Sequence, residues 1–535
     1  MNFRRLLGPV MAGFVCLAGC VDSSGTSTPG GSGSLAVVTT NADFAVAGNA
    51  YASTLTASGG TPPYTWSVVN GLPGWATLNP TTAQIVGTPS TLNVGTSNPV
   101  FRVTDAAGHV ATGSVFLAVH PRTDMLSVTS AGAAGNGASA TPSISGDGSL
   151  IAFASSATNF VTGVGGTQIY LQNRGSNQVS LVSRDNSAAS NPGTGVSSTP
   201  VISLDGTVVA FTSLAPNLLA PSIPNVSGQQ VYARDFTTGL MGLVSQSSGG
   251  VTGDGSSSAP AISSNGRFVA FVSLSTNLVT GVSGTQIYLR DRQTNQTSLI
   301  SQSTGTLGSG SVIGDGVSAA PAISSDGRFV AFVSASTNLV SGGVSGQQIY
   351  LRDTQTNQTT LVSQSSGSVT GNGASSSPSV SSSGSFATVA FASLATNLVG
   401  SVSGSQIYLR NTQAGTTSVV SFDNNVVPNA GNGTSSAPVI SSDGQFVAFV
   451  SSATNLLAPG TPSTPGPQIY LRDTVGNLTR LVSQNNSGVA STGGSTNTSP
   501  TVATNGAYVA FVSSATNLTS TIPTALTDIY VRAIP

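Results

Sequence analysis

One unit repeats seven times along this chain of 535 residues, with a period close to sixty. A proline marks each copy, and successive marker prolines lie 58, 60, 61, 57, 60 and 62 residues apart. The markers are Pro142, Pro200, Pro260, Pro321, Pro378, Pro438 and Pro500. A fixed period of this length is typical of stacked or radially arranged units, so it constrains the fold more than any other feature.

Each copy predicts four short β-strands. In the fourth copy they fall at 322–324, 329–334, 348–352 and 359–363, which are rich in Val, Ile, Phe and Tyr and bounded by turn residues. Six copies place Asp-Gly or Asn-Gly between the first two strands, which predicts a type I′ hairpin. The fifth copy has Ser383-Gly384 and two extra residues there, which predicts a looser hairpin.

The two ends of the repeat region favour a closed ring. The seventh copy stops at Ile529-Tyr-Val-Arg532 without a fourth strand, and Thr123-Asp-Met-Leu-Ser127 precedes the first copy at the offset of a fourth strand. Four antiparallel strands repeated radially form a β-propeller, and pairing these two segments would leave no open sheet edge. We therefore predict an all-β protein with a seven-bladed β-propeller at 123–535.

A family resemblance supports this fold. Ser324-Ser-Asp-Gly-Arg-Phe-Val-Ala-Phe332, followed by Gln348-Ile-Tyr-Leu-Arg-Asp353, resembles the TolB-like, WD-repeat-like propeller repeat of bacterial envelope proteins. The resemblance covers residues 123–535. The family's usual proline before the Asp is replaced, by Ser325 for example, and TolB's α/β domain has no counterpart here. The resemblance therefore implies the fold and not TolB's partners.

Residues 1–19 are expected to be a lipoprotein signal peptide. Two arginines precede an apolar run from Leu6 to Ala18 that is too short to span a bilayer. Leu17-Ala18-Gly19-Cys20 resembles a bacterial lipobox, which implies cleavage before Cys20 and acylation of that cysteine. The alternative is an ordinary secretory peptide with an incidental cysteine. Val21, rather than Asp, follows this cysteine, which resembles the pattern of lipoproteins sorted to the outer membrane. Whether the protein lies on the periplasmic or the surface side of that membrane is left open.

Two segments separate this leader from the repeats. Residues 20–34 are rich in Gly, Ser and Thr and are expected to form a flexible tether. Residues 35–120 do not follow the sixty-residue period, and their alternating runs predict a small Ig-like β-sandwich with Trp66 as a core anchor. Gly59-Gly-Thr-Pro-Pro-Tyr-Thr-Trp66 and Gly87-Thr-Pro resemble the putative-Ig, cadherin-like modules of bacterial surface proteins, although Ala83 stands where that family usually has Gly.

Composition argues against several functions. All 16 basic residues are Arg and all 17 acidic residues are Asp, and both histidines lie outside the propeller. The propeller thus lacks His, Glu, Lys and Cys as acid, base or nucleophile. A net charge of −1 without a basic stripe argues against nucleic acid, and no motif for a cofactor or metal is present.

Asp residues remain the possible catalytic groups, because paired carboxylates can hydrolyse glycosidic bonds. Most propeller Asp residues, however, occupy repeating turn positions that suit local backbone bonds. The four that follow an arginine at the end of a third strand predict Arg–Asp pairing between blades. These are Asp235, Asp291, Asp353 and Asp473.

The long connections of each blade, from strand 2 to strand 3 and from strand 4 to the next blade, should share one face, which we call the long-loop face. A Gly-Asp/Asn-Gly motif recurs there, and its central residues are the candidate ligand-binding positions Asn136, Asp254, Asp315, Asn372 and Asn432. The alternatives are a simple turn and a polar or Ca²⁺ site, although isolated carboxylates supply few ligands. A second recurring set is expected to hold the other long loop by backbone bonds: Asn159, Asn217, Asn277, Asn338, Asn397, Asn455 and Asn517.

These observations favour a non-enzymatic, lipid-anchored envelope protein whose propeller binds a protein or a glycan. One alternative is a glycan-processing enzyme, which two unrepeated carboxylates facing each other in the central channel would favour. The other is a purely structural surface module in which the sandwich acts as a spacer.

Overall fold

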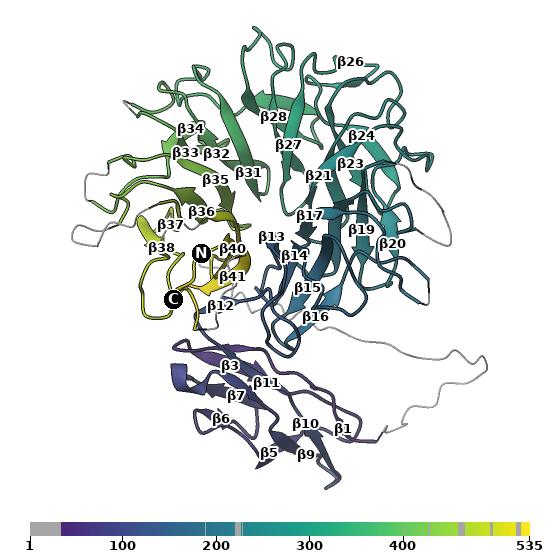
Figure 1. The fold of residues 1–535 in the computed structure, drawn as a ribbon, viewed down its shortest axis with the longest axis vertical. Helices are drawn as coiled ribbons and strands as arrows, with labels where there is room; N and C mark the ends of the chain where they lie inside the picture. Colours follow the sequence, from purple (N-terminus) through teal and green to yellow (C-terminus); the bar gives the residue numbers. More distant parts are fainter. Residues whose placement is uncertain are drawn as a thin grey trace, which may run out of the picture.

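The computed structural model describes residues 34–187, 189–219, 226, 228–400, 402–425, 429–457, 466–492, 496–520 and 526–534. Cys20, the leader and nearly all of the tether lie outside these residues. The described chain is all-β, with an N-terminal Ig-like domain followed by a propeller of seven four-stranded sheets (Figure 1). Within these described ranges, no helix is long and apolar enough to cross a membrane.

The Ig-like domain is a sandwich of short strands around an apolar core. Trp66 is buried in this core beside Ile85, Phe101 and Val103, as expected of an anchor. Ala83 adopts φ +60°, so the turn that usually carries Gly keeps its left-handed conformation here. The elements are β1 (Ala36–Val37), β2 (Ala45–Val46), β3 (Tyr51–Thr54), β4 (Ala57–Ser58), β5 (Thr65–Asn70), β6 (Ala76–Leu78), β7 (Gln84–Gly87), a 3₁₀ turn (Thr91–Asn93), β8 (Gly95–Ser97), β9 (Val100–Thr104), β10 (Val110–Ser114) and β11 (Leu117–His120).

The first three blades follow in chain order, each with its first strand innermost. Blade 1 holds β13 (Ser139–Ile144), β14 (Leu150–Ser155), β15 (Gln168–Asn173) and β16 (Gln178–Leu181). Blade 2 holds β17 (Ser197–Ile202), β18 (Val208–Ser213), β19 (Gln230–Asp235) and β20 (Met241–Leu243). Blade 3 holds β21 (Ser257–Ile262), β22 (Phe268–Ser273), β23 (Gln286–Asp291) and β24 (Gln296–Leu299).

The next three blades repeat this order after two added strands, β25 (Thr306–Leu307) and β26 (Gly310–Ser311). Blade 4 holds β27 (Ser318–Ile323), β28 (Phe329–Ser334), β29 (Gln348–Asp353) and β30 (Gln358–Leu361). Blade 5 holds β31 (Ser375–Ser383), β32 (Phe386–Ser393), β33 (Gln406–Asn411) and β34 (Thr416–Val419). Blade 6 holds β35 (Ser435–Ile440), β36 (Phe446–Ser451), β37 (Gln468–Asp473) and β38 (Leu478–Leu481).

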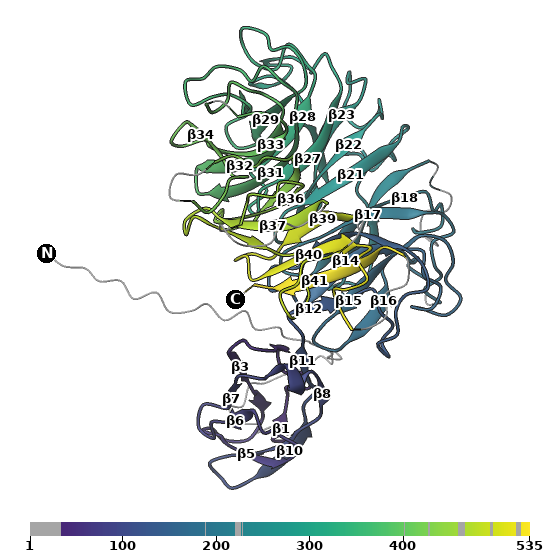
Figure 2. The same cartoon turned by 60° about the vertical axis from the view of Figure 1, so that its left-hand side comes forward.

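Blade 7 closes the ring with strands from both ends of the repeat region, as predicted. It contains β39 (Asn497–Val502), β40 (Tyr508–Ser513) and β41 (Asp528–Ala533), and its outermost strand is β12 (Thr123–Met125). β12 pairs antiparallel with β41, placing Met125 opposite Tyr530. Figures 1 and 2 show the Ig-like domain beside β12, next to the outer edge of blade 1.

The inner hairpins differ from the predicted type I′ turns. In blade 1 the amide of Gly148 donates to the Ser145 carbonyl, and only Gly148 has a positive φ (+75°). Asp147 accepts bonds from the Ser145 hydroxyl and the Ser149 amide. This is a type I turn followed by a glycine bulge, so the carboxylate caps the turn and does not adopt a positive φ.

The fifth hairpin also differs from its prediction. Its two extra residues extend β31 and β32, so that Ser383 pairs with Phe386 across a two-residue turn. The hairpin is therefore tighter than expected.

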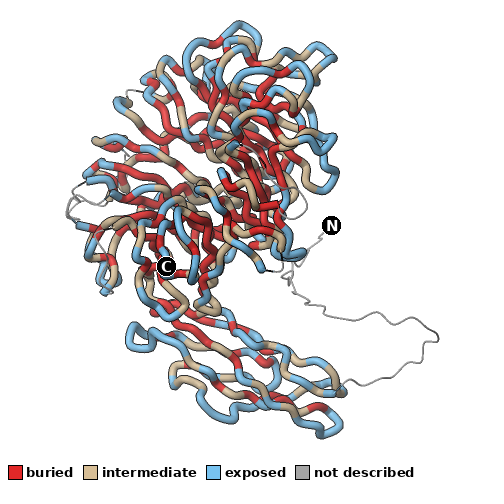
Figure 3. Tube along the Cα trace, turned by 45° about the vertical axis from the view of Figure 1, so that its right-hand side comes forward, coloured by how far each residue is buried: buried red, intermediate tan, exposed pale blue. Residues whose placement is uncertain are grey.

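The core of the propeller lies between adjacent blades. In Figure 3 the buried residues follow the strands and the exposed residues lie mainly in the connections. At the boundary of blades 3 and 4, for example, Ile287 and Leu289 pack with Val330, Phe332 and Tyr350. In every blade a buried Phe of the second strand stacks on a buried Tyr of the third, with ring centroids 5.8–6.1 Å apart. The repeated aromatic positions thus fix the blade spacing.

A repeated side-chain bond, which we call the edge latch, protects the outermost strand of every blade. A Ser, Thr or Asn in the connection leaving one blade accepts a bond from a backbone amide of the fourth strand of the next. In blade 3, for example, the Thr297 amide donates to Ser248 Oγ at 2.9 Å. Bonds of this kind occupy edge groups that could otherwise pair with another chain. The seven acceptors are Ser130, Asn186, Ser248, Thr304, Ser366, Asn424 and Asn486.

Candidate functional site: the long-loop face and the groove between blades 3 and 4

The Gly-Asp/Asn-Gly motifs join the two long connections at each blade. In blade 3, Asp254 Oδ1 accepts from the Thr276 amide at 2.7 Å and Oδ2 from the Thr276 hydroxyl at 2.7 Å. In return, Asn277 accepts from the Asp254 amide and donates to the Thr252 carbonyl. The Thr276 bonds lower the pKa of Asp254, so its carboxylate is charged at neutral pH. The two connections are therefore cross-linked by four hydrogen bonds.

The other four predicted site residues have the same environment. Asp315 bonds Thr337, and Asn136, Asn372 and Asn432 bond the threonines of their own blades in the same way. All five side chains are thus engaged in holding loops, and ligand binding at them stays a prediction. The expectation that the second Asn set holds loop backbone is confirmed, because each of its seven amides donates to a backbone carbonyl.

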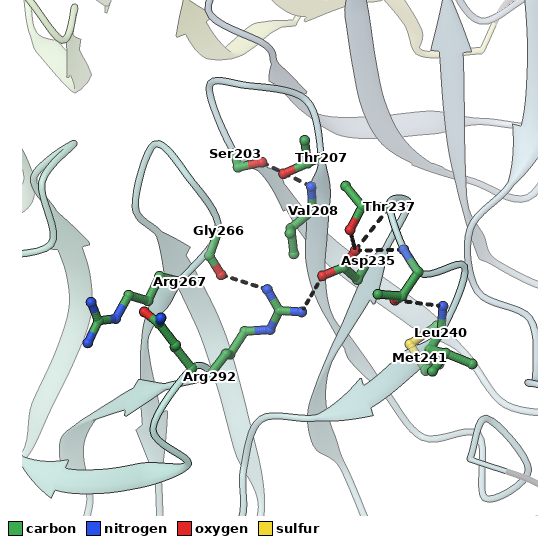
Figure 4. A network of polar contacts seen from close by, with 12 residues as sticks. Ser203, Thr207, Val208, Asp235, Thr237, Leu240, Met241, Gly266, Arg267 and Arg292 are labelled. Carbon is green, nitrogen blue, oxygen red and sulfur yellow. Dashed lines mark hydrogen bonds and ion pairs between the residues drawn. The ribbon is translucent and has the colours of Figure 1, made fainter. Parts of the chain in front are cut away.

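The Arg–Asp pairs on the opposite face follow the prediction only in part. Asp291 receives two bonds from Arg267 and Asp353 receives two from Arg328, and both pairs lie within one blade. Asp235 is paired between blades, with Arg292 Nη2 at 3.1 Å (Figure 4). Arg292 also donates to the Gly266 carbonyl at 2.7 Å. Asp473 bonds the amide of Gln445 in its own blade, so pairing between blades is wrong for three of the four residues.

The third-strand arginines have a different role. Arg352, for example, is 1% exposed and donates to the Ser303 and Gly305 carbonyls at 2.8 and 2.5 Å. Burial lowers its pKa to about 10, so it remains charged at neutral pH. It thus fixes the connection from the preceding blade.

The central channel has an uncharged lining. The innermost strands enclose about 300 Å³, lined by residues such as Ile202, Ile262, Ile323 and Ser379. Among the described residues that line it, none carries a carboxylate. The facing pair that would favour a glycosidase is therefore not seen in this lining.

A groove lies at the outer edge of blade 4, between the connection that arrives from blade 3 and the long loop of blade 4, and we call it the blade 3–4 groove. Its volume is about 790 Å³, and its described lining combines hydroxyl and amide groups with aliphatic side chains and includes no charged residue. Val312 at its rim is 53% exposed. The lining is formed by Ser303, Thr304, Val312, Asn338, Leu339, Val340, Ser341, Gly342, Gly343, Val344, Thr359, Thr360, Leu361, Gln364, Ser368 and Thr370.

Two features of single copies form this groove. The connection from blade 3 to blade 4 carries β25 and β26, a pair of added strands that the other described connections do not have. The facing loop of blade 4 contains Gly342 and Gly343, with φ +88° and +65°, and is one residue longer than its counterpart in blade 3. The repeat accounts for the scaffold, whereas a binding site for one ligand requires segments that differ from one blade to another.

Hydrogen bonds hold the wall formed by residues 303–312. Thr304 Oγ1 accepts from the Thr359 amide, and the Gly305 amide donates to the Asn357 carbonyl at 2.8 Å. Ser311 Oγ donates to the Ser303 carbonyl at 2.9 Å. The inserted segment is therefore bonded both to β30 and to itself, which favours a preformed groove.

Sequence reasoning named Asn338 as one of a recurring set but missed the groove, because the inserted segment at 303–312 and the glycine pair at 342–343 do not follow the repeat. The available signals were the greater length of the connection after β24 and the paired glycines at 342–343. A search for repeated polar residues discards both signals.

Comparisons with known proteins find matches to both parts of the chain. Residues 32–120 match the family described as Putative Ig domain. No curated protein matches the chain. The propeller of the Trilobed protease from Pyrococcus furiosus is similar, with 11% identity, 74% of this chain and 93% of that chain covered, and a TM-score of 0.43. The putative TolB from Agrobacterium tumefaciens is also similar, with 14% identity, 74% of this chain and 90% of that chain covered, and a TM-score of 0.30. Dipeptidyl peptidase 4 from Porphyromonas gingivalis is similar with 14% identity, 69% of this chain and 48% of that chain covered, and a TM-score of 0.39.

Proposed function

We propose that this protein is a non-enzymatic, lipid-anchored protein of the bacterial cell envelope whose propeller binds a neutral glycan in the blade 3–4 groove. The observation that supports this proposal is that the groove has an uncharged lining. Two segments that depart from the repeat, the insertion with β25 and β26 and the loop with Gly342 and Gly343, form its walls. Sugar hydroxyls suit Ser, Thr, Asn and Gln partners, and sugar C–H faces suit aliphatic side chains such as Leu339 and Leu361. A protein partner is the alternative for the same surface.

A blocking variant tests the glycan proposal. Ser341 is exposed on the groove wall, and Thr280 occupies the equivalent loop position in blade 3 outside the groove. Ser341→Trp should weaken binding to immobilised neutral glucans, mannans or chitin oligomers at least tenfold, while Thr280→Trp should bind as wild type. If none of these glycans binds wild type and an envelope protein is captured by wild type but not by Ser341→Trp, the partner is a protein. If both variants behave alike, the groove is not the binding site.

The anchor is proposed from the lipobox at Cys20, and several acyl chains on one cysteine would hold a soluble fold on the outer membrane. Labelled palmitate should enter the wild-type protein and not Cys20→Ser, and the variant should be released from the membrane fraction. Label in Cys20→Ser at the wild-type level would exclude the anchor.

A further inference from the structure

Six blades share a fully engaged amide at the start of the third strand. In blade 4, Gln348 Oε1 accepts from the Ser363 hydroxyl at 2.6 Å, and Nε2 donates to the carbonyls of Gly371 and Gly373 at 3.1 and 3.4 Å. These glycines flank the central residue of the Gly-Asn-Gly motif. The six buried glutamines at this position are Gln168, Gln230, Gln286, Gln348, Gln406 and Gln468.

Blade 7 has Asp528 at this position. Asp528 pairs with Ser513 in the register in which Gln348 pairs with Ser334, and its Oδ1 accepts from the Ser127 hydroxyl at 2.7 Å. The neighbouring backbone is also equivalent, because the Gly135 amide donates to the Ser127 carbonyl as Gly371 does to Ser363. The carbonyls of Gly135 and Gly137 therefore correspond to those that receive the amide protons in the other blades.

Asp528 cannot make those bonds. A carboxylate has no proton to give, and Asp is one methylene shorter than Gln. The residue is 0% exposed, and its Oδ2 has no hydrogen-bond partner. Burial raises the pKa of Asp528 against the opposing effect of the Ser127 bond. Tyr530, two residues along the same strand, has a second buried oxygen without a partner, its hydroxyl.

In blade 7 a carboxylate thus takes the place of the amide group that donates to these carbonyls in the other blades, and its Oδ2 is left without a partner. Buried carboxylates are normally paired or bound to a cation. A single proton could satisfy only one of the two glycine carbonyls, and it would have to span the gap left by the missing methylene. A cation attracts every oxygen around it and sits more than 2 Å from each.

We propose that Asp528, Ser127 and the carbonyls of Gly135 and Gly137 bind one monovalent cation at the seam that closes the propeller. One carboxylate with neutral oxygens balances a single positive charge. The described residues contain no cluster of three or more His, Cys, Asp or Glu that would suit a multivalent ion. The cation would link β41 to the connection after β12, joining the two ends of the ring.

Ion replacement in the full-length protein tests the site. At pH 7.5 and constant ionic strength, replacing choline chloride by NaCl or KCl should raise the thermal midpoint of wild type by several degrees, because a ligand of the folded state stabilises it. Asp528→Gln, which restores the residue of the other blades, should show no cation dependence. Gln348→Asp, the converse change in blade 4, should introduce one.

A direct measurement keeps the test independent of how the variants fold. The ²³Na relaxation rate should increase in the presence of folded wild type at pH 7.5, and the increase should disappear when KCl competes or when acid protonates Asp528. Equal cation dependence of wild type and Asp528→Gln would overturn the proposal. The proposal would also be overturned if the stability of the wild-type protein did not depend on cations and instead fell as pH rises, because Asp528 would then be a neutral carboxylic acid.

Discussion

At the scale of single residues, the marker prolines have a role that the sequence did not reveal. The residue before each marker has a positive φ of 47–50°, and the pairing register of the first strand shifts there in all seven blades. None of these residues is Gly. A left-handed conformation costs an ordinary residue about 1–2 kcal/mol, so every blade carries a strained bulge.

Thr141 combines this backbone strain with an unsatisfied hydroxyl and gives a prediction. It is β-branched at φ +49°, and its buried hydroxyl has no hydrogen-bond partner. Thr141→Gly should relieve the backbone strain and remove an unsatisfied group, and we expect about 1 kcal/mol of stabilisation. Thr199→Gly is the matched control, because it loses the 2.9 Å bond from Thr199 Oγ1 to Thr212 Oγ1. Urea unfolding of both variants measures the difference, and an equal gain for both would contradict the role of the hydroxyl.

A charged side chain can also be tested at this scale. Burial raises the pKa of Asp353, but bonds from Arg328 and the Gln355 amide outweigh it and lower the pKa to about 2, against an ordinary 3.8. A lowered pKa means that the stabilisation is complete above the ordinary pKa and is lost as pH falls from 4 towards 2. Blade 5 has Asn411 at this position, with the turn bonds intact. Asp353→Asn should therefore show a smaller loss of thermal midpoint between pH 4 and pH 2 than wild type, and an identical loss would exclude the effect.

At the scale of elements, the edge latches can be tested directly by mutation. Ser248→Ala removes the acceptor of the Thr297 amide and should cost about 1 kcal/mol. Hydrogen exchange should then increase for the amides of β24 and remain as in wild type for the inner strands of blade 3. Ser256→Ala, an exposed change in the same connection, serves as the control. Unchanged exchange at Thr297 would show that the latch does not protect this edge.

The elements also show how far sequence reasoning reaches. Four strands per blade follow from Val, Ile, Phe and Tyr in short runs, and the repeat makes that pattern unambiguous. The inner turn was assigned wrongly because Asp-Gly fits both a type I′ turn and a type I turn with a glycine bulge, and only the Asp147 side-chain bonds separate them. Pairing between blades was predicted wrongly for three of the four aspartates, because the sequence does not say whether Asp291 faces Arg267 of its own blade or an arginine of the next. The blade 3–4 groove depends on two loops meeting in space, which no local pattern encodes.

At the scale of the whole molecule, ring closure was predictable and the junction of the two domains was not. The missing fourth strand of blade 7 and the spare strand at 123–127 could be matched by counting, and β12 pairs with β41 accordingly. The junction depends on Phe44, Arg174 and Tyr508, which lie far apart in the sequence and follow no repeat. The Arg174 guanidinium lies over the Phe44 ring at 4.2 Å and the Tyr508 ring at 5.0 Å.

Arg174 should therefore fix the Ig-like domain against the propeller. It is 1% exposed, it donates to the Gly148 carbonyl, and its own carbonyl bonds His120 Nε2 at 2.9 Å at the end of the Ig-like domain. Buried cation–π contacts contribute about 2 kcal/mol, so Arg174→Ala should release the domain without unfolding either part. Small-angle X-ray scattering should then show a larger radius of gyration and maximum dimension, whereas Arg102→Ala, at an exposed arginine of β9, should scatter as wild type. A rigid junction would hold the propeller at a set angle from the Ig-like domain, and unchanged scattering of Arg174→Ala would mean that the linker alone sets that angle.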